Sequence, residues 1–79
     1  MQVDVEKIRK EVGKRIKIRR IELDINQREL AKILGICQTH VSEWEAGRRP
    51  IRVEHIIQLT HVLKMTSAQL LGEESYTLQ

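Results

Sequence analysis

The feature that most constrains the fold is a pair of short helical segments separated by only three residues. The first predicted helix spans residues 27–34, with Asn26 as its cap and Glu29 completing a capping box. It ends at Gly35, where a left-handed residue can stop a helix. Its predicted apolar face consists of Leu30, Ala31, Ile33 and Leu34. The second helix is predicted over residues 38–46. A three-residue connection containing glycine forces two helices to cross steeply, and helices this short need further elements to pack against.

Three more helices are predicted from the same periodicity, and no alternating run indicates a strand. The longest is expected over residues 5–23, with Asp4 as its N-cap and a possible bend or frayed end before Gly13. Another is expected over residues 52–63. A short fifth helix is expected to carry Leu70 and Leu71, with a cap in the segment Thr66–Gln69 and Gly72 as its stop. The predicted core face of the 52–63 helix consists of Val53, Ile56, Ile57, Thr60 and Leu63.

The composition predicts one small all-α, five-helix domain with an aliphatic core. The chain has 79 residues, no Phe, one Trp and one Tyr, so Ile, Leu, Val and Ala have to fill the interior. We expect a single domain over residues 1–79, with its core at about 12–71. Residues 1–11 then form an N-terminal helical extension and residues 72–79 form a tail.

Basic residues gather in two places, which indicates a negatively charged partner. Residues 7–20 hold eight Lys or Arg and one acid, and a second cluster consists of Arg48, Arg49 and Arg52. No stretch is apolar enough to span a membrane. The single Cys37 excludes an internal disulfide, and acids near the N-terminus argue against a signal peptide, so we expect a cytoplasmic protein. Cys37 is expected to be buried or to cap a helix. No catalytic constellation, metal site, cofactor or small-molecule site is evident, so no enzyme is predicted.

Several residues in order resemble one known family. The pattern consists of Gln27, Leu30, Ala31, Gly35, Val41, Trp44, Glu45 and Gly47. It is similar to the lambda-repressor-like, Xre-type helix-turn-helix domains of phage repressors and Cro proteins, over residues 12–71. Cys37 departs from the pattern, because Ser or Thr usually caps the third helix there.

The resemblance implies a site for double-stranded DNA. The implied base-reading residues of the third helix are Gln38, Thr39, Ser42 and Glu43. The residues expected to contact phosphates are Gln27, Asn26, Lys17, Arg48, Arg49 and Arg52. Arg20 and Glu45 both point toward the predicted core, where isolated charges are costly, and the resemblance implies that they form a buried salt bridge.

These residues predict a sequence-specific transcriptional regulator, most simply a repressor that binds an inverted repeat as a homodimer. The expected dimer contact lies around Leu59, Met65 and Leu71. The alternative is a protein-interaction module of antitoxin or adaptor type with the same fold, for which the long first helix and the segment Tyr76–Leu78 would suit a partner protein. Steep salt dependence and a preferred DNA site would favour the regulator.

Overall fold

Five helices form in the computed structural model, which describes residues 4–73, and this part contains no strand. The helices are α1 (Val5–Glu22), α2 (Gln27–Leu34), α3 (Gln38–Glu45), α4 (Val53–Val62) and α5 (Ser67–Leu71). Each agrees with a predicted helix to within one residue at either end, apart from the two ends of α5, for which only the flanking residues were predicted. Residues 1–3 and 74–79 lie outside the described residues, and they include the ends of the expected extension and tail with Tyr76–Leu78.

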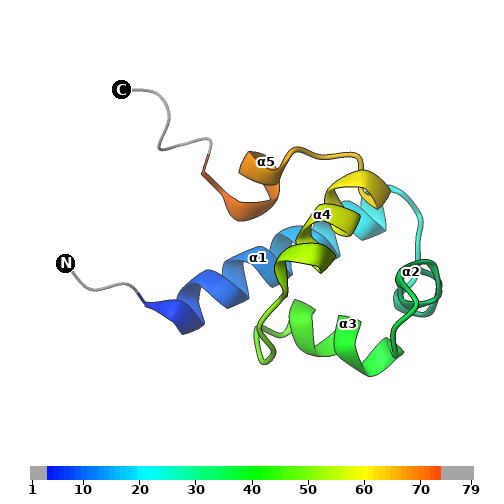
Figure 1. Cartoon of the computed structure of the whole chain (residues 1–79), viewed down its shortest axis with the longest axis horizontal. Coiled ribbons are helices and arrows are strands. Elements are labelled where there is room, and N and C mark those ends of the chain that lie inside the picture. Colours follow the sequence, from blue (N-terminus) through cyan, green and yellow to red (C-terminus); the bar gives the residue numbers. More distant parts are fainter. Residues whose placement is uncertain (1–3, 74–79) are drawn as a thin grey trace.

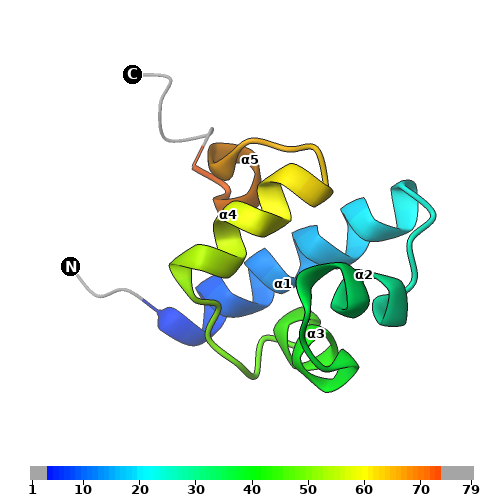
Figure 2. The same ribbon diagram turned by 45° about the vertical axis from the view of Figure 1, so that its right-hand side comes forward.

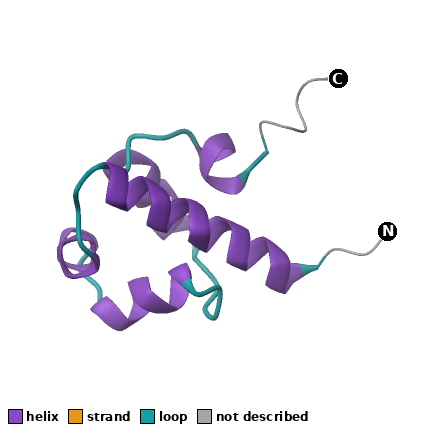
Figure 3. Ribbon diagram, turned by 180° about the vertical axis from the view of Figure 1, so that it is seen from behind, coloured by secondary structure: helices purple, strands orange, loops and turns teal. Residues whose placement is uncertain are grey.

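Helix α1 runs along the length of the molecule, and α3 and α5 pack on opposite sides of it (Figures 1 and 2). Asp4 caps α1 by accepting a hydrogen bond from the backbone N–H of Lys7, as predicted. The helix continues without interruption through Gly13, so the expectation of fraying there is wrong. Viewed from behind, only helices and their connecting loops are seen over the described residues (Figure 3).

The core is aliphatic around one tryptophan. Its buried members are Val12, Ile16, Leu30, Ala31, Leu34, Val41, Trp44, Leu59, Leu63 and Leu70. Some residues predicted on a core face are instead exposed, namely Ile33 (57%), Val53 (68%) and Ile57 (54%). The same is true of Val5 (50%) and Ile8 (46%), which helical spacing aligns with Val12 and Ile16 on the predicted core side of α1. Helix α4 turns Leu59 and Leu63 inward, which rotates its core face away from Val53 and Ile57. Because Leu59 is fully buried, its expected role in a dimer contact is wrong.

Two reciprocal capping boxes fix where α2 and α5 begin. Asn26 accepts from the Glu29 N–H while Glu29 accepts from the Asn26 N–H, at 2.8 and 3.1 Å. Thr66 and Gln69 do the same for α5. Gly35 ends α2 with a φ of 71°, the left-handed conformation predicted there. No helix in residues 4–73 has the length and apolar character that crossing a membrane requires.

Candidate nucleic-acid interface

The turn between α2 and α3 sets the direction of α3. The Ile36 N–H donates to the carbonyl of Ala31 at 3.0 Å, which closes the end of α2 before the chain reverses. Figure 1 shows α2 nearly end-on while α3 lies across the page, so the two axes cross steeply, as predicted. Val41 and Trp44 anchor α3 to the core, and both are buried. The opposite side of α3 therefore faces outward.

Three of the four predicted base-reading residues are exposed on this outward side. Gln38, Thr39 and Ser42 are exposed, and no hydrogen bond within residues 4–73 engages their side chains. Gln38 and Thr39 precede Ser42 by four and three residues, so the three side chains lie close together on one side of the helix. Their amide and hydroxyl groups are thus free to bind a ligand.

The fourth predicted reading residue, Glu43, is held by a basic residue of its own chain. The Arg49 Nε donates to Glu43 Oε1 at 2.7 Å, and both side chains are partly exposed. Both residues are candidates for DNA contact, and the structure brings them together. The ion pair reduces the repulsion that a lone carboxylate would meet near phosphates.

A buried network ties α3 to α1 and α2. Arg20 donates from Nε to Glu45 Oε2 at 2.7 Å and from a second nitrogen to Glu45 Oε1 at 3.1 Å. Its third guanidinium nitrogen donates to the carbonyl of Ile25 at 2.8 Å. The Gln27 amide adds a third bond to Glu45 at 3.0 Å. The predicted Arg20–Glu45 salt bridge is therefore present, and it is bidentate, a geometry that fixes orientation.

Gly13 allows α1 and α3 to touch backbone to backbone, which the sequence analysis missed. Gly13 is buried, and a Cβ built there would overlap the carbonyl oxygen of Trp44 and approach the backbone of Glu45. A glycine that interrupts a good helical pattern without ending the helix was the available signal. The contact places the C-terminal end of α3 directly on α1.

The predicted phosphate contacts differ in how free their side chains are. Asn26 is used as the α2 cap, and Gln27 is bound to Glu45. Both lie at the N-terminal end of α2, where free N–H groups favour an anion. Lys17, Arg48 and Arg52 are exposed and form no ion pair within the described chain.

Two further residues, Arg19 and Cys37, lie in surroundings that the sequence did not indicate. Arg19, counted with the basic surface of α1, donates to the carbonyls of Leu63 and Lys64 at the end of α4. Cys37 is exposed and makes no capping hydrogen bond, so the expected buried or capping thiol is wrong. Helix α3 begins without a side-chain cap because a thiol is a poor acceptor.

Comparison with known proteins identifies the family. A family model described as a helix-turn-helix matches residues 16–71, which is most of the chain. The chain belongs to the helix-turn-helix family of transcription regulators. Its similarities are to regulators, in agreement with the prediction that it is not an enzyme.

The chain is similar in sequence to three proteins of phages and bacteria. The "ImmF control region 10 kDa protein" of Bacillus phage phi105 is 38% identical over 74 residues, covering 85% of this chain and 82% of the relative. The regulator DicA of Escherichia coli K12 is 38% identical over 64 residues (80% and 47%). Repressor protein C2 of Salmonella phage P22 is 33% identical over 67 residues (84% and 31%). The chain thus spans under half the length of the last two.

The solved structure of a gene regulator supports the fold. The clp gene regulator ClgR from C. glutamicum superimposes with a TM-score of 0.78 at 25% identity, covering 91% of this chain and 92% of that one. The all-α, lambda-repressor-like fold predicted from the sequence is therefore confirmed.

Proposed function

We propose that this chain is a sequence-specific repressor that binds an inverted-repeat operator in double-stranded DNA as a homodimer. The observation that carries the proposal is the outward face of α3, where Gln38, Thr39 and Ser42 are exposed and unbonded. A helix of this width fits the major groove of B-DNA. The Arg20–Glu45 network underneath holds that face in one orientation.

The chemistry of the face suits base recognition. Gln38 can form two hydrogen bonds with adenine, and the Thr39 methyl group can pack on the methyl group of thymine. Glu43 can accept from cytosine N4 while it remains paired with Arg49. On either side, the N-terminus of α2 and the exposed Arg48 and Arg52 are available for phosphates.

Repression and dimerisation are supported by physical and comparative arguments. One α3 helix contacts too few base pairs to distinguish one site from the many non-specific sites of a genome. Two α3 helices related by two-fold symmetry read a palindrome, which contains twice as many base pairs. A relative at 33% identity is named Repressor protein C2. Met65 and Leu71, both partly buried, remain the proposed dimer contact. A repressor has to share a compartment with its operator DNA, so the proposal includes a cytoplasmic location.

Selection of bound duplexes from a random pool tests the proposal. We expect the selected sequences to share a palindrome and to bind at least about a thousandfold more tightly than random DNA at physiological salt. Affinity should fall steeply with salt, because phosphate contacts release counterions. Equal binding to selected and random duplexes would contradict a sequence-specific repressor.

A further inference from the structure

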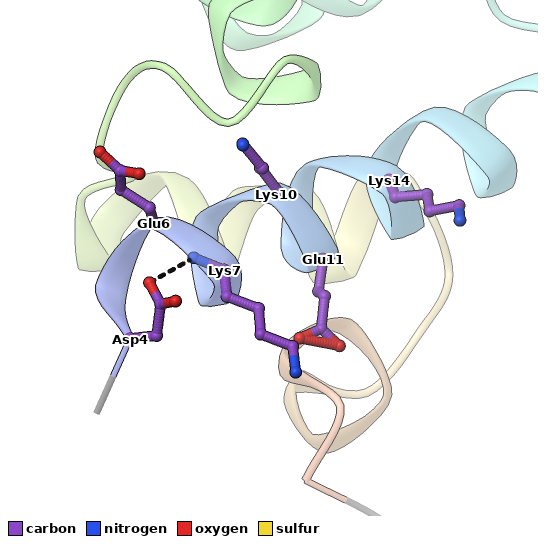
Figure 4. Close-up of a pocket in the computed structure, with 6 residues that line it drawn as sticks. All are labelled: Asp4, Glu6, Lys7, Lys10, Glu11 and Lys14. Carbon is purple, nitrogen blue, oxygen red and sulfur yellow. Dashed lines mark hydrogen bonds between the residues drawn. The ribbon is translucent and has the colours of Figure 1, made fainter. Parts of the chain in front are cut away.

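The N-terminal half of α1 lies outside the segment that defines the family. The family match begins at residue 16, whereas α1 begins at Val5. A shallow hollow along this half is lined by Asp4, Glu6, Lys7, Lys10, Glu11 and Lys14. Figure 4 shows these side chains pointing to different sides of the helix.

One line of residues along α1 faces α3. Lys10, Gly13, Lys17 and Arg20 are spaced by three, four and three residues, which aligns them on one side of a helix. Gly13 contacts the backbone of α3, and Arg20 binds Glu45 at its last turn. Lys10 extends the same line by one turn toward the N-terminus of α1.

Lys10 rests against the loop that leaves α3. A Cβ added to Gly47 would lie 2.5 Å from Lys10 Cγ and 2.8 Å from its Cα, so the lysine stem packs closely on that glycine. Lys10 is exposed and forms no ion pair with any acid in residues 4–73. In Figure 4 it points toward the ribbon of α3 and its loop, whereas Lys7 points toward the side of α5. The next loop residue, Arg48, is also exposed.

We propose that Lys10 binds a DNA backbone phosphate beyond the C-terminal end of α3, so that the extra length of α1 enlarges the DNA-binding surface. The inference rests on the proposed function. Lysine suits this role because its ammonium is a compact charge with three donors and needs no fixed geometry. Glu6 points to the same side one turn earlier. Because its carboxylate repels a phosphate, the proposed phosphate position lies nearer Gly47 than the start of α1.

The test compares Lys10→Gln with the matched control Lys7→Gln. Both changes remove one positive charge from the same exposed stretch of α1, and glutamine keeps part of the stem that packs on Gly47. The equilibrium constant for one duplex is measured over a range of salt concentrations. Each phosphate contact contributes about 0.9 to the slope of log K against log salt. We expect Lys10→Gln to reduce the slope by about that amount for each bound chain and Lys7→Gln to leave it unchanged.

The outcomes separate this inference from the proposed function. If the wild type binds duplex DNA and Lys10→Gln keeps its full salt slope, Lys10 does not contact phosphate. Equal losses in both variants would also overturn the inference, since they would reflect net charge alone. Lys10→Arg should retain the wild-type slope. If the wild type binds no duplex, the proposed function itself fails.

Discussion

At the scale of single residues, intramolecular bonds divide the outer side of α3 into free and engaged groups. Glu43 is paired with Arg49, whereas Gln38, Thr39 and Ser42 have no side-chain partner within residues 4–73. A free amide or hydroxyl can bind a base edge without first breaking a bond to its own protein. We therefore expect the strongest discrimination between bases from Gln38 and Thr39.

Replacing Gln38 by alanine should relax base preference at one position of each half-site. The expected cost is about 1–3 kcal/mol for the preferred base pair, with little change for other sequences at that position. Competition binding with operators altered one base pair at a time measures it. Gln58→Ala is the matched control, because Gln58 is an exposed glutamine on α4. An unchanged preference in Gln38→Ala would remove Gln38 from the reading face.

Replacing Arg20 by alanine should destabilise the fold and weaken DNA binding together. Removing Arg20 leaves the buried Glu45 carboxylate with the Gln27 amide as its one remaining side-chain partner within residues 4–73, and such losses cost about 3–5 kcal/mol. Urea denaturation measures the free energy of unfolding. The exposed Arg28 provides the control, since Arg28→Ala should change it by less than about 0.5 kcal/mol. A fully stable Arg20→Ala protein would contradict the structural importance of this pair.

At the scale of helices, local signals were sufficient where the cause is local. The capping residues Asn26 and Thr66 and the terminating Gly35 act within one turn, so the sequence predicted the bounds of α2 and the start of α5. The core face of α4 was predicted wrongly. Apolar residues occur on most sides of this helix, so periodicity does not select one face. Packing against α5 and the shared core turns Leu59 inward.

The candidate site was predicted less completely than the helices. The Arg20–Glu45 pair followed from a family resemblance and from two charges directed at a core. The Glu43–Arg49 pair and the Gly13 contact depend on how a loop and a distant helix return to α3. Such tertiary contacts leave no periodic signal in the chain, so spacing alone does not reveal them.

Gly13→Ala should destabilise the packing of α3 on α1. Alanine favours a helix interior by about 1 kcal/mol over glycine, but here its Cβ would overlap the Trp44 carbonyl. We expect the overlap to dominate, with a net loss of about 1–3 kcal/mol in unfolding free energy. Thermal unfolding followed by circular dichroism measures the change. The exposed neighbour Lys14 serves as control in Lys14→Ala, and a Gly13→Ala protein more stable than wild type would refute the close contact.

At the scale of the whole molecule, the proposed homodimer sets the expected distance between half-sites. Two α3 helices related by symmetry should enter the major groove about 34 Å apart, one turn of B-DNA. Inserting about five base pairs at the operator centre rotates one half-site by about half a turn, away from the second subunit. We expect a loss of most of the specific affinity and a complex with one chain in place of two, measured by gel shift and ultracentrifugation. Undiminished two-chain binding would contradict a rigid symmetric dimer.

The meeting of main chains at Gly13 has a consequence for how such a protein diversifies. No side chain lies between the two backbones at Gly13, so exchanging a side chain there cannot adjust the tilt of α3. A different tilt would require a change in the backbone of α1. New target sequences are then most easily acquired by exchanging the outermost side chains on an unchanged frame. Substitutions on the exposed face of α3 can therefore change the target sequence, whereas the backbone contact at Gly13 has to stay as it is.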